Sequence, residues 1–231
     1  MIPKIIHQTA QTMNLTWEER RLQKRAKKLM PDYQFILYDD EKRQKFVEAH
    51  FPQYAERFRN IAKGVCKADV ARLMFLYICG GWYCDTDYKW ILPPPLTLVN
   101  KKCVLGISRE NMNPMRIGNA VFGSEPGVDF WKDFIDHIFT STELSDIKEN
   151  RIEKVTGPEG LTDFYWANKD KYDDIYLAPR EVLLPLLTPH AYKAYSTKDT
   201  VGIHLCWGSW RTSQISRRIK NWLRRKITAI I

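Results

Sequence analysis

Apolar and amphipathic segments alternate along the chain, and this alternation predicts strands followed by helices. The apolar run Pro3–Gln8 predicts a buried first strand. Thr16 is a typical N-cap residue followed by acidic residues, and it predicts a helix that ends near Leu29, before Pro31. Gln34–Tyr38 predicts a second strand. Strands that alternate with helices are typical of an α/β architecture.

The remainder of the chain continues this alternation. Further helices are predicted at residues 40–50, 52–59, 60–79, 128–139 and 157–166, and further strands at residues 82–84, 103–107, 120–122, 175–177 and 201–206. The segment Ser141–Lys154 is polar and weakly patterned, so we expect a surface excursion there. Without an internal repeat or a low-complexity linker, residues 1–212 are expected to form one domain, followed by a tail of residues 213–231.

The most informative stretch, residues 67–87, reads KADVARLMFLYICGGWYCDTD and ends in Asp85 and Asp87. Side chains at i and i+2 of a strand point the same way, and a tight turn can also bring them together. Two converging carboxylates suit Mg²⁺ or Mn²⁺, ions that keep coordination positions open for substrate phosphates. A lone DxD pattern is often a surface turn. Here the apolar context favours a metal site, since neighbouring carboxylates repel unless a cation neutralises them.

Other polar residues in apolar surroundings are candidates for the same site. Asp69 and Arg72 lie one helical turn apart, and they form either a local ion pair or part of a ligand site. The segment 204–210, HLCWGSW, reads as a core strand and turn. Beside a carboxylate metal site, His204 becomes a further ligand for Mn²⁺, and the Trp210 indole N–H becomes a donor to a leaving phosphate.

The end of the first predicted strand carries His7, Gln8 and Thr9. Ligands of open α/β sheets bind beyond the carboxyl ends of strands, so these residues are candidates for donor binding. The alternative is simple strand termination. Gly118 and Asn119, like Thr156 and the two residues after it, are turn signals first and site residues only by association.

Composition limits the class of protein. The chain has 231 residues, of which 44% are apolar, which excludes a disordered chain. Five scattered cysteines without a CxxC pair predict reduced thiols and a cytosolic protein. The uncharged run Leu73–Cys84 is too short to span a bilayer. The net charge is +9, but seven basic and no acidic residues follow position 210. The nearly neutral body argues against a nucleic-acid binder.

The tail predicts an amphipathic helix. Its apolar stripe consists of Ile215, Ile219, Trp222, Leu223, Ile227 and Ile230, and its basic residues lie away from that stripe. This profile is typical of a helix that lies in an anionic membrane surface, and it predicts peripheral attachment to the inner face of the cell membrane. The alternative is a solvated helix that packs its stripe on the domain.

In this order, five segments resemble glycosyltransferase family 32: residues 2–8, 67–87, 117–127, 156–158 and 204–210. That family holds bacterial capsular and other polysaccharide transferases and the yeast initiating α-1,6-mannosyltransferase, with the clostridial glucosylating toxins as distant relatives. The resemblance implies a GT-A fold and retaining transfer of a sugar from a nucleotide-sugar donor. It also implies dependence on a divalent cation, usually Mn²⁺.

The resemblance also implies roles for individual residues. It implies metal binding by Asp85, Asp87 and His204, catalytic roles for Asp69, Arg72, Asp85, Asp87 and Asn119, and donor binding by His7, Gln8, Thr9, Asp69, Arg72, Asp85, Ser209 and Trp210. A UDP-hexose is the favoured donor and GDP-mannose the second. The expected acceptor is a glycan or lipid-linked glycan in surface polysaccharide synthesis.

Two other functions stay open at this point. In a nucleotide-sugar hydrolase or phosphoesterase, water would replace the sugar acceptor at the same metal site. In a membrane-surface scaffold, the site would be vestigial. The intact acidic pair and the HLCWGSW segment favour an active transferase over the scaffold.

Overall fold

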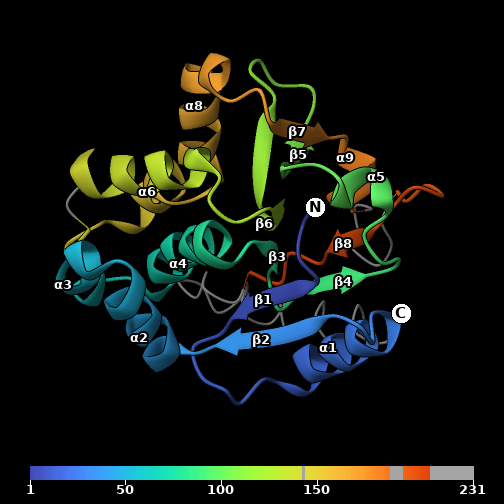
Figure 1. Ribbon diagram of the computed structural model, residues 1–231, viewed down its shortest axis with the longest axis horizontal. Helices are drawn as coiled ribbons and strands as arrows, with labels where there is room; N and C mark the ends of the chain where they lie inside the picture. The colour runs from blue at the N-terminus through green and yellow to red at the C-terminus, as the bar shows by residue number, and fades with distance from the viewer. Residues whose placement is uncertain (142–143, 188–194, 209–231) are drawn as a thin grey trace.

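The computed structural model describes residues 1–141, 144–187 and 195–208 (Figure 1). Ser209, Trp210 and the predicted tail helix, residues 213–231, lie outside the described residues. Within the described part of the chain, no helix combines the length and the apolar composition needed to cross a membrane.

A six-stranded sheet in the order β2-β1-β3-β6-β5-β7 forms the centre of the molecule (Figure 1). β1 pairs in parallel with both β2 and β3, β6 is antiparallel to β3 and β5, and β7 is parallel to β5. A separate antiparallel ribbon joins β4 to β8. The strands are β1 Ile5–Thr9, β2 Gln34–Tyr38, β3 Gly81–Cys84, β4 Tyr88–Trp90, β5 Cys103–Arg109, β6 Arg116–Ser124, β7 Ile175–Ala178 and β8 Gly202–His204.

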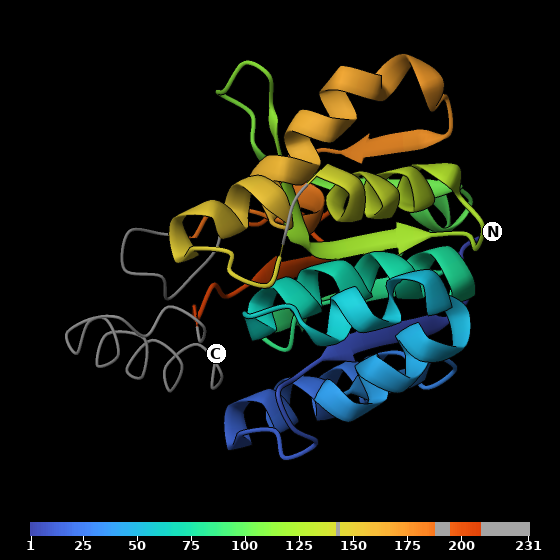
Figure 2. The same ribbon diagram turned by 90° about the vertical axis from the view of Figure 1, so that its left-hand side faces the viewer.

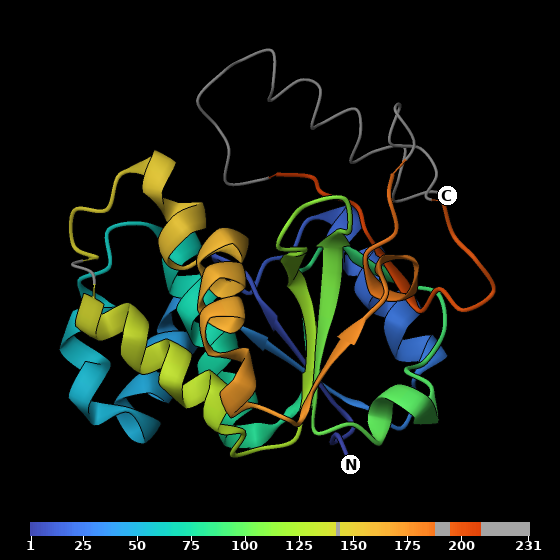
Figure 3. The same cartoon turned by 90° about the horizontal axis from the view of Figure 1, so that it is seen from above.

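Helices cover both faces of the sheet (Figure 3). The α-helices are α1 Trp17–Leu29, α2 Asp40–His50, α3 Ala55–Arg59, α4 Gly64–Cys79, α5 Leu96–Val99, α6 Asp129–Ser141, α7 Ile152–Val155, α8 Pro158–Asn168 and α9 Arg180–Leu183. The described residues also form the short 3₁₀ helices η1 Pro52–Tyr54, η2 Glu149–Arg151 and η3 Lys169–Lys171. The predicted α/β architecture is confirmed.

Alternate residues along the strands pack in two separate hydrophobic cores, one on each face of the sheet. Tyr83 on β3 packs in a core with α2, α3, α4, α6 and α8, whereas its neighbours Trp82 and Cys84 pack in a second core with α1, α5 and α9. β5 follows the same rule, with Cys103 and Leu105 in the first core and Val104 in the second. This period of two is what a sheet covered on both faces requires.

The junction between α4 and β3 requires glycine. α4 is buried on several sides, as its sequence predicts, and it ends at Gly80, whose φ is 63°. A Cβ atom on Gly80 would lie 2.7 Å from the Pro126 nitrogen and 2.8 Å from the Ser124 carbonyl oxygen. The chain can therefore reverse at this point only with glycine, and the reversal directs β3 toward the end of the sheet where Asp85 lies.

The structure corrects some predicted boundaries. α4 begins at Gly64 rather than at residue 60, because Asn60 ends α3. The predicted surface excursion at Ser141–Lys154 holds for Ser145, Asp146 and residues 148–151, which are exposed, but Leu144, Ile147 and Ile152 anchor the segment in the first core. These apolar anchors are spaced irregularly among polar residues, so neither a helical nor a strand period revealed them. β4 had no sequence signal of its own because it has three residues.

His7 on β1 is buried in the protein interior. Its Nε2 lies 2.9 Å from the Gly80 carbonyl oxygen and its Nδ1 lies 3.2 Å from the Tyr38 hydroxyl. Burial lowers the pKa of His7 to about 4, although the hydrogen bond to Gly80 acts in the opposite direction. Between pH 6.5 and 4, the unfolded chain therefore binds a proton at His7 that the folded chain does not bind.

We predict that this difference makes the protein less stable as the pH falls through that window. Between pH 7 and pH 4 the wild type should lose about 3 kcal/mol more unfolding free energy than His7→Gln, which does not titrate. Urea unfolding at several pH values measures the difference. The exposed His50→Gln is the matched control and should follow the wild type. Parallel stability curves for wild type and His7→Gln would contradict the buried neutral imidazole.

Candidate active site

The two predicted carboxylates lie in a tight turn directly after β3. The strand ends at Cys84, the Asp85 backbone N–H donates to the Ala120 carbonyl oxygen at 2.9 Å, and the Tyr88 N–H donates to the Asp85 carbonyl oxygen at 3.0 Å. β4 begins immediately afterwards at Tyr88. A tight turn, rather than a continued strand, therefore holds Asp85 and Asp87.

The β4–β8 ribbon brings His204 to this turn from the far end of the sequence. Tyr88 pairs with His204 across the ribbon. The His204 Nε2 lies 3.2 Å from Asp87 Oδ1 and 3.8 Å from Asp85 Oδ2. One ligand atom from each of these three residues lies within 4.8 Å of the others. Two carboxylate oxygens and one imidazole nitrogen are a suitable donor set for Mn²⁺ and an acceptable one for Mg²⁺.

Backbone and side-chain contacts fix the orientation of this trio. The Trp207 backbone N–H donates to Asp87 Oδ2 at 2.7 Å. The second ring nitrogen of His204, Nδ1, lies 3.3 Å from Cys206 Sγ. Partners of this kind hold ligand side chains in one orientation before a cation binds. The side chain of Asp87 is 13% exposed, so the trio faces solvent only in part.

The three groups perturb one another's protonation. Burial raises the pKa of Asp85 above its usual range, although Arg72 and His204 oppose that shift. Burial also raises the pKa of Asp87, but His204 outweighs it, and the pKa lies below the usual range. Burial lowers the pKa of His204, but the charge of Asp87 outweighs it and raises the pKa well above 6.5. A proton on His204 therefore competes with a divalent cation for this site.

A buried polar network lies behind the trio. The Arg72 Nη2 atom lies 3.0 Å from Asp69 Oδ1 and 3.5 Å from Asp85 Oδ1. The Asn119 amide donates to Asp69 Oδ1 at 3.0 Å, and the Thr156 hydroxyl donates to Asp69 Oδ2 at 3.0 Å. Arg72 also donates to the Asn119 carbonyl oxygen. Burial raises the pKa of Asp69 to about 7, although Arg72 acts in the opposite direction. Arg72 thus connects the Asp69 carboxylate on α4 to the Asp85 carboxylate of the trio.

The sequence analysis did not identify Tyr83 as a site residue. Its hydroxyl donates to Asp85 Oδ1 at 2.7 Å and lies 3.0 Å from the Thr9 hydroxyl. The Arg72 guanidinium lies over the Tyr83 ring, 4.5 Å from its centroid. Its position two residues before Asp85 was the available signal, because such residues share one side of an extended chain. Tyr83 orients the Asp85 carboxylate through a partly buried hydrogen bond.

The N-terminus of α1 holds the turn from the other side. The Thr86 hydroxyl donates to Glu19 Oε1 at 3.0 Å, and Glu19 is the residue that completes the capping box of α1 with Thr16. The Gln8 side chain donates to the Asp85 carbonyl oxygen at 3.4 Å. The Gln23 side chain donates to Gln8 Oε1 at 3.2 Å. The turn and α1 therefore form one connected unit.

The structure brings most of the predicted site residues together. Asp85, Asp87 and His204 form the trio, Asp69, Arg72 and Asn119 form the network behind it, and Gln8 and Thr9 reach it through hydrogen bonds. His7 points elsewhere, toward Gly80 and Tyr38, so a donor-binding role would not involve direct contact with the trio. Ser209 and Trp210 lie outside the described residues.

Known proteins resemble this chain in sequence and in fold. The chain is 28% identical to the mannosyl phosphorylinositol ceramide synthase SUR1 of Saccharomyces cerevisiae over 85% of this chain and 49% of that protein. It is 36% identical to inositol phosphoceramide mannosyltransferase 3 of Schizosaccharomyces pombe over 37% of this chain and 24% of that protein. The chain thus matches about half the length of SUR1 and about a quarter of the second protein.

A solved structure titled PaToxG Glycosyltransferase superposes with a TM-score of 0.55 and 20% identity over 74% of this chain and 72% of that chain. That likeness concerns the fold, and the predicted GT-A fold is confirmed. Residues 17–103, which include Asp69, Arg72, Asp85 and Asp87, match the family model described as "Glycosyltransferase sugar-binding region containing DXD motif". The predicted resemblance to DXD-containing glycosyltransferases is therefore confirmed, and the match extends over residues 17–103 of this chain.

Proposed function

We propose that this protein is a metal-dependent glycosyltransferase that moves a hexose from a nucleotide-sugar donor to an acceptor hydroxyl. The observation that carries the proposal is the convergence of Asp85, Asp87 and His204 within 4.8 Å, at the DXD motif of a matched sugar-binding region. A hydrolase could use the same trio. The relatives are named as mannosyltransferases and synthases, which favours transfer over hydrolysis.

Asp85, Asp87 and His204 would hold Mn²⁺ or Mg²⁺. When bound there, the cation would act as a Lewis acid that stabilises negative charge on the departing diphosphate. The protein's own residues supply the remaining electrostatics. Arg72 places a permanent positive charge 3.5 Å from Asp85, which limits the repulsion between the two carboxylates. Trp210, outside the described residues, remains the proposed N–H donor to the same phosphate.

We propose that transfer retains the configuration of the sugar, by attack on the face from which the phosphate leaves. The position of Asp69 supports this route over a covalent one. Its Oδ1 accepts from Asn119 and its Oδ2 accepts from Thr156, so both oxygens are engaged and the side chain is 3% exposed. A nucleophile needs a free oxygen that reaches the anomeric carbon. A glycosyl adduct trapped on Asp69 would contradict this proposal.

The names of the relatives bear on the donor and the acceptor. Since they are mannosyltransferases, GDP-mannose replaces a UDP-hexose as the first candidate donor. The second relative is named for inositol phosphoceramide, so a lipid-linked acceptor replaces the free glycan of capsular polysaccharide synthesis as the first candidate acceptor. The tail, residues 213–231, remains a proposed membrane-associating segment on the inner face of the membrane, and it lies outside the described residues.

We predict that GDP-mannose with Mn²⁺ raises the thermal unfolding midpoint more than any UDP-hexose, because a ligand that binds only the folded state stabilises it by mass action. A thermal-shift panel of nucleotide sugars, with and without Mn²⁺, measures this. A larger shift with a UDP-hexose would reverse the order of donors. Faster release of free sugar without an acceptor than transfer to any acceptor would favour the hydrolase.

The second prediction concerns Asp87→Asn. The variant removes one negative ligand but retains an oxygen that can accept from the Trp207 N–H, so the fold should be maintained. Mn²⁺-dependent nucleotide release should fall by at least about 100-fold. The exposed Asp146→Asn is the matched control and should retain the wild-type rate. Near-normal turnover by folded Asp87→Asn would remove the metal-site argument.

The third prediction concerns Tyr83→Phe, which removes the hydroxyl that donates to Asp85. The Mn²⁺ concentration for half-maximal activity should rise about 10-fold, while the rate at saturating Mn²⁺ stays close to wild type. Tyr54→Phe is the matched control, because it removes a phenol that donates to a carboxylate, Asp136, away from the site. A lower rate that excess Mn²⁺ does not restore would show that Tyr83 does more than orient Asp85.

A further inference from the structure

The exposed side of α1 carries only basic residues and one tryptophan. The exposed basic residues are Arg20, Arg21, Lys24, Arg25, Lys27 and Lys28. None of these six side chains forms an ion pair with a carboxylate among the described residues. The two acidic residues of the helix do not interrupt this surface, because Glu18 is buried and Glu19 faces Thr86. We call these six residues, with Trp17 and Met13, the α1 basic face.

The spacing of these residues places them on one continuous arc. At about 100° per residue, the six basic positions cover about 160° of the helix circumference, and Trp17 falls near the middle of that arc. Leu22 and Ala26 lie on the opposite side and are buried against the domain. Figure 1 shows α1 beside the edge strand β2, and Figure 2 shows it at one end of the molecule.

This concentration of charge is unfavourable within the protein itself. Residues three and four apart on a helix are neighbours, so Arg21, Lys24 and Lys28 repel one another. Arg25 adds to the cost, because its charge contributes, after burial, to the lowered pKa of Lys89 on β4. An anionic partner outside the described residues would offset this repulsion.

Apolar groups beside the charges indicate the kind of partner. Trp17 is 47% exposed and Met13 is 45% exposed. The Arg21 guanidinium lies over the Trp17 ring, 5.6 Å from its centroid. Between α1 and β2, a hollow of about 500 Å³ is lined by basic side chains, including Arg20, Lys27 and Lys42, and by the apolar residues Leu15, Phe35 and Leu37. Tryptophan beside lysine and arginine is typical of surfaces that enter the headgroup layer of a bilayer.

We propose that the α1 basic face docks on an anionic lipid bilayer. A nucleic acid would use the charges but would leave Met13 and the apolar lining of the hollow without a partner. Docking here would also place the site close to the lipid, because Glu19 on α1 accepts from Thr86 between the two DXD carboxylates. This surface is separate from the tail, and its connection to a lipid-linked acceptor rests on the proposed function.

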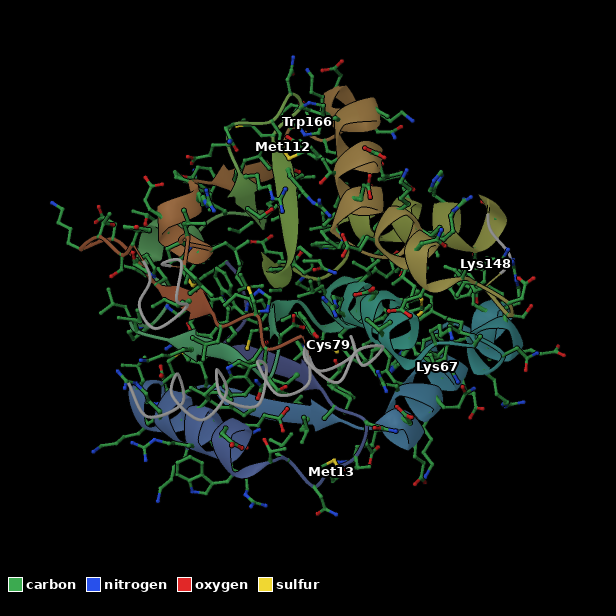
Figure 4. The ribbon with its side chains drawn as sticks, turned by 180° about the vertical axis from the view of Figure 1, so that it is seen from behind. Met13, Lys67, Cys79, Met112, Lys148 and Trp166 are labelled. Carbon is green, nitrogen blue, oxygen red and sulfur yellow. The ribbon has the colours of Figure 1, made fainter. Side chains whose placement is uncertain are left out.

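The test is co-sedimentation of the full chain with vesicles of phosphatidylcholine containing a fifth phosphatidylserine. Arg21→Gln, Lys24→Gln and Lys28→Gln, combined in one variant, remove the charges around Trp17. The matched control is Lys148→Gln, Arg151→Gln and Lys171→Gln, three exposed basic residues elsewhere on the molecule. Figure 4 shows Lys148 well away from Met13. Circular dichroism and thermal unfolding establish that both variants are folded.

At about 1 kcal/mol for each basic residue near the surface, the α1 variant should bind these vesicles about 100-fold more weakly than the wild type. The control should lose less than about 3-fold, and Trp17→Ala should also weaken binding. Equal binding by the α1 variant and the control would overturn the proposal. So would binding of the wild type to single-stranded RNA that is tighter than to the vesicles and is lost in the α1 variant.

Activity separates this proposal from the proposed function. The α1 variant should retain the wild-type rate of donor hydrolysis in the absence of lipid, since none of its three changed residues lies in the site. Asp87→Asn should lose activity and retain vesicle binding. Loss of vesicle binding only in the α1 variant supports docking, whatever the outcome for Asp87. Normal activity in Asp87→Asn would contradict the proposed function but not the docking face.

Discussion

The repulsion between Asp85 and Asp87 is the constraint on which the site depends. Two carboxylates one residue apart in a partly buried turn are costly unless positive charge lies beside them. The chain supplies that charge from two directions, with Arg72 on α4 at 3.5 Å from Asp85 and His204 on β8 at 3.2 Å from Asp87. These residues come from distant parts of the sequence, so the acidic turn and the fold around it stabilise each other.

Arg72 and His204 neutralise the charge of Asp85 and Asp87 only in part, and one of the two neutralising charges can be removed. The proton on His204 can leave, whereas the charge on Arg72 cannot. In the proposed function, a divalent cation would take the place of that proton, with the His204 ring as a ligand, without disturbing the pair of Arg72 with Asp69. Tyr83 and Thr86 contribute fixed orientation rather than charge, because each connects the turn to a neighbouring strand or helix by one hydrogen bond. The proton on His204 can therefore be exchanged, while the Arg72–Asp69 pair and the hydrogen bonds of Tyr83 and Thr86 stay in place.

The sequence was sufficient to predict a feature where a short-range sequence pattern and the tertiary structure agree. The Gly-Gly break and the acidic pair follow from short-range patterns, and the structure has both. It was insufficient where a residue acts through a distant partner. Nothing local shows that β4 pairs with β8 and so delivers His204. The buried anchors Leu144 and Ile147 were missed for a related reason, since a buried segment without a helical or strand period has no repeating signal.

The α1 basic face illustrates the opposite limit of sequence analysis. The net charge of the residues before the tail is nearly neutral. This sum did not reveal that every exposed residue of α1 is basic, apart from Trp17. Burial of Glu18 and the contact of Glu19 with Thr86 remove both acidic residues from that surface. Glu19 completes the capping box of α1 and accepts a hydrogen bond from Thr86 in the DXD turn. One side chain therefore contributes to the start of the helix, to the geometry of the site and to the absence of negative charge on the α1 basic face. A membrane-facing role for α1 would explain why the helix tolerates repulsion among six basic residues that form no ion pair with a described carboxylate.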